Sequence, residues 1–150
     1  MGAAYFYHLT ESPLEQTLPM LLGKALDAGW RVEVRGTNRA RLDSLDQSLW
    51  GGARDAFLPH GIAGGDHDDL QPVLLTDTPA TGRTCVVGID GAEITPSEVQ
   101  GAERVMIVFD GMSGDAVARA REQWKALTAA GCSAQYWAQD MGRWTKKAEA

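Results

Sequence analysis

The chain has 150 residues, of which 44% are hydrophobic, and its 14 basic and 20 acidic residues give a net charge of −6 at pH 7. This length and composition fit a folded domain with a real core and argue against disorder. No apolar run approaches the roughly 20 residues of a membrane helix, so we expect no membrane contact. The acidic balance also argues against non-specific DNA binding, because that binding depends on Lys and Arg side chains displacing counterions.

The first third of the chain alternates between strand and helix patterns. The run AYFYHL (4–9) predicts a strand, and WRVEV (30–34) predicts a second one. Between them, SPLE (12–15) has the pattern of a capping box with Ser12 as the N-cap. Leucines at helical spacing follow, so we expect a helix that ends at Gly29.

The middle of the chain combines one helix, one long loop and two short strands. Residues 37–50 carry leucines at the spacing of an amphipathic helix. Residues 51–71 show no periodicity and predict a long loop, and such loops in compact domains are often functional. The runs PVLL (72–75) and TCVVGI (84–89) predict strands.

The last third contains the most apolar segment of the chain. RVMIVF (104–109) predicts a central strand, and Ser113 is placed to cap a helix that ends at Gly131. CSAQYWAQ (132–139) predicts a last strand, and residues 142–150 form a polar tail. We therefore expect one α/β domain over residues 1–150, with three layers and a mostly parallel central sheet.

Sequence motifs for cofactors are missing. Neither GxxxxGK[ST] nor GxGxxG occurs, and the turn TESP (10–13) after the first strand has no glycine. We therefore expect no nucleotide site. Cys85 and Cys132 form no CxxC motif and predict two buried thiols in a cytoplasmic protein. His8 and His60 accompany no recognisable nucleophile motif, so we assign both to structure, and we expect no metal and no cofactor.

Asp110 is the strongest candidate for catalysis. In VFDG (108–111) it stands at the carboxyl end of a central strand, where open α/β sheets bind ligands. A carboxylate there can hold Mg²⁺ or accept a phosphoryl group, as in a small phosphohydrolase or phosphotransfer domain. The competing interpretation is a plain Asp-Gly turn, which we favour because no second carboxylate or lysine accompanies it in the sequence.

The predicted helix after Ser113 carries a basic and apolar surface on an otherwise acidic protein. Arg121 and Lys125 are four residues apart and share a face, with Val117 one turn earlier and Trp124 at its border. Such a surface suits a short acidic peptide that ends in an apolar residue with a free carboxylate. The alternative is a solvated face in which the long side chains merely cover the sheet.

Several short segments, in their order and spacing, resemble the chi subunit of the bacterial DNA polymerase III holoenzyme, an accessory protein of the clamp loader. The resemblance covers nearly the whole chain. Its markers are FYHL (6–9), KALDAGWRVEVR (24–35), LDSLDQSLW (42–50), FLPHG (57–61), QPVLL (71–75), FDG (109–111), AREQWKAL (120–127) and YWAQDMGRW (136–144).

The resemblance implies an adaptor without an active site. Chi subunits have a Rossmann-like fold without a nucleotide and bind the acidic, Phe-ended C-terminal tail of single-stranded DNA-binding protein. By position, the tail-binding residues here are Phe109, Val117, Arg121, Trp124 and Lys125. The chain would then act in the cytoplasm at the replication fork, contact DNA only indirectly, and have no polymerase activity apart from that of the complex.

The resemblance also implies a second partner. Chi subunits bind the psi subunit of the clamp loader, and the matching exposed anchors here are Trp50, Phe57 and Leu58. A helicase is an alternative partner for the same residues, and partial burial of Trp50 and Phe57 is a second alternative. His60 would then be a structural part of the PHG turn.

One departure concerns the tail site. The family's helix has a further basic residue one turn before Arg121, where this chain has Val117. Arg104 or the segment 143–147 could supply the missing charge. A helicase-like lobe is a third alternative, because residues 28–50 have the strand–helix pattern of helicase domains, although the missing P-loop excludes ATP hydrolysis by this chain alone.

Overall fold

The computed structural model describes residues 2–50, 60–64, 71–80 and 82–150. In these residues the strands are β1 Ala3–Leu9, β2 Val32–Arg35, β3 His60–Ile62, β4 Val73–Thr76, β5 Cys85–Gly88, β6 Arg104–Asp110, β7 Ser133–Asp140 and β8 Arg143–Glu149. The helices are α1 Leu14–Asp27, α2 Arg39–Trp50, α3 Pro96–Gly101 and α4 Gly114–Ala129.

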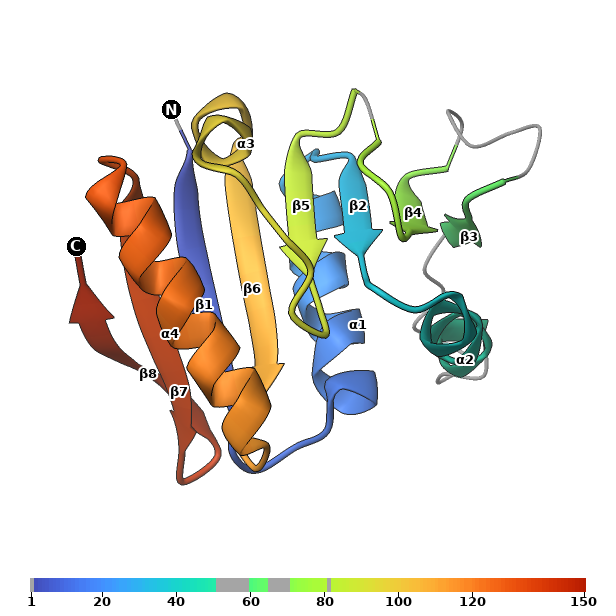
Figure 1. The fold of residues 1–150 in the computed structure, drawn as a ribbon. Coiled ribbons are helices and arrows are strands. Elements are labelled where there is room, and N and C mark those ends of the chain that lie inside the picture. The colour runs from blue at the N-terminus through green and yellow to red at the C-terminus, as the bar shows by residue number, and fades with distance from the viewer. Residues whose placement is uncertain (1, 51–59, 65–70, 81) are drawn as a thin grey trace.

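The strands form one sheet in the order β3-β4-β2-β5-β6-β1-β7-β8. Every neighbouring pair is parallel except β7 and β8, which are antiparallel. Helices α1 and α2 pack on one face of this sheet, and α3 and α4 pack on the other (Figure 1). The predicted three-layer, mostly parallel α/β fold is thereby confirmed.

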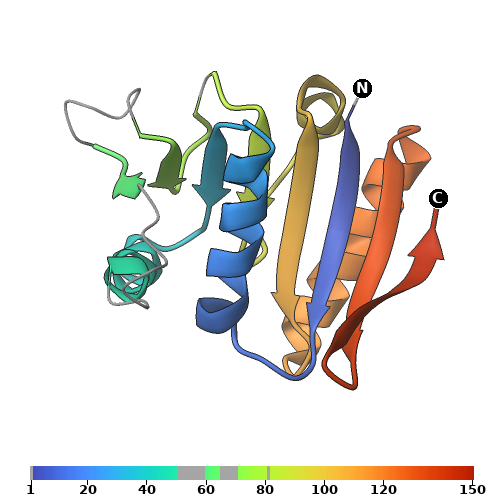
Figure 2. The same ribbon diagram turned by 180° about the vertical axis from the view of Figure 1, so that it is seen from behind.

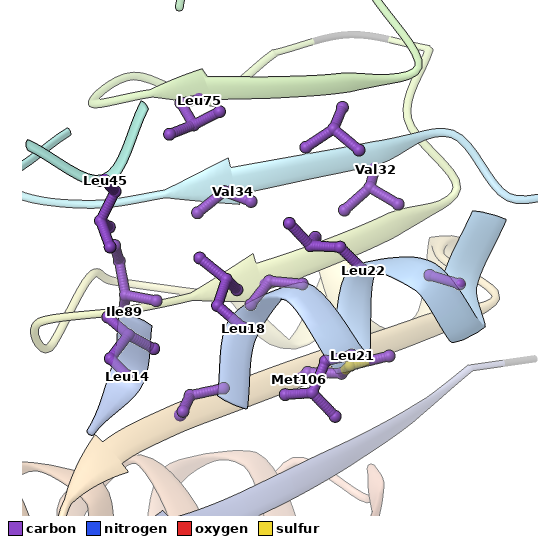
Figure 3. Close-up of a cluster of buried hydrophobic side chains, with 14 of the residues drawn as sticks. Leu14, Leu18, Leu21, Leu22, Val32, Val34, Leu45, Leu75, Ile89 and Met106 are labelled. Carbon is purple, nitrogen blue, oxygen red and sulfur yellow. The ribbon is translucent and has the colours of Figure 1, made fainter. Parts of the chain in front are cut away.

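Two hydrophobic clusters hold the layers together, one on each face. On the first face, leucines at helical spacing along α1 pack on the valines of β2, and Met106 of β6 lies beside them (Figure 3). On the second face, alternate residues of β1 and β6 pack beneath α4, with Phe6 fully buried. Central strands lie between two helical layers, which explains why their runs are apolar without a clear alternation.

The predicted capping box at residues 12–15 is wrong. Helix α1 begins after Pro13, and no side chain caps it. The Ser12 hydroxyl lies 2.8 Å from the Thr17 hydroxyl and accepts a hydrogen bond of 2.7 Å from the Gln139 amide instead. This bond ties the turn after β1 to strand β7, so tertiary contacts replace the local cap.

The sequence patterns missed three elements. The segment predicted as a polar tail is β8, which joins β7 through Met141 and Gly142, both with positive φ (51° and 77°), as hairpin turns require. Strand β3 lies within the predicted loop 51–71 and pairs with β4. Helix α3 begins at a capping box in which Thr95 and Glu98 bond each other's backbone N–H.

Cys85 and Cys132 are both buried and free, as predicted. Burial raises the pKa of the Cys85 thiol to about 12, so this sulfur stays protonated and unreactive at neutral pH. Among the described residues, no helix has the length and apolar character needed to cross a membrane.

Candidate binding face on helix α4

Helix α4 starts directly behind the carboxyl end of β6. Asp110 accepts a hydrogen bond of 2.9 Å from the Met112 N–H, which turns the chain out of the strand. Ser113 then accepts one of 3.2 Å from the Ala116 N–H, so the predicted N-cap is confirmed. Asp110 therefore has a structural role in this turn, and the described part of the chain contains no cluster of three or more potential metal ligands.

The predicted residues of α4 form a strip along the helix, which we call the α4 strip: Val117, Arg121, Trp124 and Lys125. Val117 and Trp124 are half-buried against the core cluster of this face. Arg121 and Lys125 are exposed, and neither pairs with a carboxylate that the structure describes. The strip thus combines apolar surface with two positive charges that have no counterion within the described part of the chain.

Arg119 on the same helix behaves differently. Its Nε donates a hydrogen bond of 3.2 Å to the Gly91 carbonyl, and its Nη1 lies 3.7 Å from the Glu122 carboxylate. Both contacts lie away from the α4 strip, so Arg119 does not replace the basic residue that this chain lacks at Val117.

Aromatic rings pack beneath and beside the α4 strip. The Trp124 ring meets those of Phe6 and Tyr136 edge to face, at centroid distances of 5.3 and 6.2 Å. His8 stacks on Phe109 at 4.9 Å, and its Nδ1 lies 2.6 Å from the Tyr136 hydroxyl. We call His8, Phe109, Trp124 and Tyr136 the ring cluster. Phe109, only 6% exposed, is the floor of this cluster and not part of the surface.

The ring cluster favours a neutral histidine. Burial lowers the pKa of His8, and the nearby charge of Arg121 lowers it further, while a hydrogen bond to the Gly111 backbone acts in the opposite direction. Neutral His8 can accept a hydrogen bond at Nδ1 from the Tyr136 hydroxyl group. Burial in turn raises the pKa of Tyr136. Gly111 allows this arrangement, because a Cβ there would lie 2.3 Å from the His8 ring.

His8 and Tyr136 were not predicted as site residues. Their distance along the sequence hides them, because β1 lies between β6 and β7 in the sheet. The register sets Phe6 against Tyr136 and His8 against Phe109. The one available signal was the alternation within the strand runs, which places residues of the same parity on one face.

Of the two proposed sources of extra positive charge, only part of the segment 143–147 lies on the α4 side of the sheet, because Lys146 pairs with Trp137 of the α1 side. Lys147 of β8 contacts Asp140 at 3.6 Å, and Asp140 has the same strand parity as Tyr136, so this lysine is on the α4 side. Arg104 begins β6, and its guanidinium packs on Tyr5 and Trp30 on the α1 side. Arg104 therefore cannot add its charge to the α4 strip.

The residues predicted for the second partner fall at the end of α2. Trp50 is the last residue of that helix, and its side chain, with Phe57 and Leu58, lies outside the described residues. His60 follows as the first residue of β3, where it is 4% exposed and its Nε2 lies 3.2 Å from the Asp46 carboxylate. The predicted structural role of His60 fits this burial, although the residue belongs to a strand and not to a turn.

Comparison with known protein families shows which family the chain belongs to. The model for the DNA polymerase III chi subunit, HolC, matches residues 1–135. The chain belongs to the chi subunit family. It is therefore an accessory subunit of the DNA polymerase III complex, with a role in DNA replication. The match includes β1, β6 and α4, which carry His8, Phe109 and Trp124 of the ring cluster, and it ends one residue before Tyr136. A search of curated proteins gave no match.

Proposed function

We propose that this chi subunit is a non-catalytic adaptor that links the clamp loader to the acidic, Phe-ended C-terminal tail of single-stranded DNA-binding protein. The observation that carries the proposal is the α4 strip, where Arg121 and Lys125 lack a counterion among the described residues and stand beside half-buried Val117 and Trp124. The strip offers both halves of what such a tail needs, namely positive charge and an apolar surface.

The chemistry of the tail suits this strip. Its carboxylates would accept charge-assisted hydrogen bonds from Arg121 and Lys125. Its terminal ring would pack on the exposed edges of Val117, Trp124 and Tyr136, and Phe109 would support these rings from below. Arg121 should contribute more than Lys125, because its charge lies close enough to the ring cluster to lower the pKa values of His8 and Tyr136.

The second partner of the adaptor is the psi subunit or, in its place, a helicase. We assign this contact to Trp50, Phe57 and Leu58, because the resemblance to chi subunits places the anchors at these positions and large aromatic side chains are common anchors of protein interfaces. The strand order supports two simultaneous contacts, because α2 and β3, which flank Phe57 and Leu58 in the chain, lie at one edge of the sheet, while α4 covers strands toward the other (Figure 1). The protein would work in the cytoplasm at the replication fork and touch DNA only through its partners.

The test is a fluorescence anisotropy titration with a labelled acidic peptide that ends in Phe with a free carboxylate. We expect binding by the wild type that weakens with salt, because part of the contact is exposed charge. Arg121→Ala should cost about 1–3 kcal/mol, the scale of a lost charge-assisted hydrogen bond, and Lys125→Ala less. Arg39→Ala, which removes an exposed cation from α2, away from α4, is the matched control and should bind normally.

Equal affinity in Arg121→Ala and the wild type would contradict the assignment of the tail to α4. The second contact is tested separately by co-purification with the psi subunit. Phe57→Ala should lose psi and keep the tail peptide, whereas loss of both would indicate a folding defect.

A further inference from the structure

A second aromatic surface lies on the other face of the sheet. A pocket of about 300 Å³ opens beside α1, and the described residues that line it include five aromatic side chains, Tyr5, Tyr7, Trp30, Trp137 and Trp144. All five are half-buried. On this face α1 leaves β1, β7 and β8 without a covering helix (Figure 2). We call this cavity the α1-side pocket.

Arg104 lies among these rings with part of its hydrogen-bonding capacity unused. Its guanidinium carbon is 4.0 Å from the centroid of Tyr5 and 5.1 Å from that of Trp30. The Nε atom is buried, and no described residue accepts its hydrogen bond. Cation–π contacts hold the guanidinium plane but leave the N–H groups at its edge unsatisfied. A buried donor without a partner is rare in folded proteins and indicates a missing acceptor.

A second cation faces the same pocket. Lys24 of α1 is exposed, lines the pocket and forms no ion pair within the described part of the chain. The described lining includes no carboxylate, although the protein has a net charge of −6. The site therefore combines two positive groups with a ring-lined wall and lacks an anion of its own.

We propose that the α1-side pocket binds a protein segment in which a carboxylate lies beside an aromatic side chain. The carboxylate would accept hydrogen bonds from the half-buried Arg104 guanidinium and from Lys24, and the aromatic group would pack against Tyr7 and Trp144. Tyr7 and Trp144 meet edge to face at a centroid distance of 5.2 Å, which leaves ring faces for a third aromatic group.

The charge pattern favours a peptide over a nucleic-acid strand. A strand carries a phosphate at every nucleotide and needs a continuous basic path. Here the two cations are isolated, because Asp27 follows Lys24 on the last turn of α1 and Glu103 precedes Arg104. One carboxylate satisfies the pair, whereas a row of phosphates would meet these acidic neighbours. The proposed site is separate from the α4 strip, which lies on the opposite face.

The experiment uses the full chain and a labelled probe peptide, Asp-Glu-Phe-Phe-Glu-Asp, with both ends blocked. Blocked ends remove the terminal carboxylate that we assign to the α4 strip. Anisotropy should report binding to the wild type and none for the neutral counterpart Asn-Gln-Phe-Phe-Gln-Asn. Lys24→Gln removes an exposed charge and is expected to fold normally, and Arg104→Lys keeps the charge but removes Nε. Each should weaken binding by about tenfold, the equivalent of one charge-assisted hydrogen bond.

Arg121→Ala is the control and should bind the probe as the wild type does. Thermal melting checks that all variants fold. Wild-type affinity in both Lys24→Gln and Arg104→Lys would overturn the proposal, and so would loss of the probe in Arg121→Ala, because the probe would then occupy the α4 strip. Binding of oligo(dT) with no binding of the peptide would overturn it in favour of single-stranded DNA.

Discussion

The two faces of β1, β6 and β7 both carry aromatic rings, but the rings have different partners. On the α4 face, a helix covers the rings, and the polar groups satisfy each other, since the Tyr136 hydroxyl lies 2.6 Å from His8 Nδ1. The cations stand outside, on the helix. On the α1 face none of the described helices covers β1 and β7 (Figure 2), and Arg104 lies among the rings with a buried Nε for which no described residue is an acceptor.

This difference helps to distinguish aromatic rings that complete a core from aromatic rings that form a binding site. Strand alternation alone delivers rings to both faces, so aromatic content does not distinguish a core from a binding site. The position of the charged groups does distinguish a core from a binding site. On the α4 face the rings are already packed under the helix, so a ligand can meet the charged groups only at the exposed surface of α4. On the α1 face the rings surround an open pocket, which can accept an inserted group.

The largest expected effect compares neighbouring residues of β1. Phe6 is fully buried beneath α4, with its ring 5.3 Å from Trp124, so Phe6→Ala should destabilise the protein by about 3–5 kcal/mol. Tyr7→Ala should cost clearly less, because the half-buried Tyr7 ring lines an open pocket. Urea denaturation measures both. Equal losses would mean that the α1 face is packed as completely as the α4 face.

A second prediction tests how tightly the ring cluster is packed. Gly111→Ala would place a Cβ 2.3 Å from the His8 ring and 2.6 Å from the Leu9 carbonyl oxygen. We expect a loss of about 1–3 kcal/mol, typical of overpacking, together with a changed environment of His8 in NMR spectra. Gly114→Ala is the matched control: it meets no atom within 4 Å and lies in α4, so its stability should equal or exceed that of the wild type.

Sequence alone predicted most of the architecture, because apolar runs and helical spacing record burial directly. Two similar motifs show where local patterns fail. Ser12-Pro13-Leu14-Glu15 and Thr95-Pro96-Ser97-Glu98 share the same form, yet only the second makes a capping box. At the first motif, the Gln139 amide N–H donates a hydrogen bond to the Ser12 hydroxyl. The Gln139 amide oxygen accepts hydrogen bonds from three backbone N–H groups of the turn. A partner so distant in sequence cannot be seen in a local pattern.

The candidate sites also differ in how far a local pattern could predict them. The members of the α4 strip lie within one helix, so helical spacing was enough to group them. The ring cluster and the α1-side pocket combine residues from several strands, and their composition depends on the strand order. Sheet position also explains β8, whose polar residues suit an edge strand exposed to solvent and therefore resemble a tail.

The smallest expected effect is a dependence of stability on pH that arises from His8. Burial and the charge of Arg121 hold the pKa of His8 below its ordinary value of 6.5. At pH values between the pKa of His8 in the folded protein and the ordinary value of 6.5, the unfolded chain binds more protons than the folded one. The free energy of unfolding therefore falls as the pH drops below 6.5. His8→Gln keeps an acceptor for Tyr136 but does not titrate. Urea denaturation from about pH 8 to about pH 5 should therefore show the advantage of the wild type over His8→Gln shrinking on acidification. Carboxylates titrate in both proteins and cancel in this difference. Parallel curves would mean that His8 titrates alike in both states, and the α4 face would then lack the closed packing that distinguishes it from the α1 face.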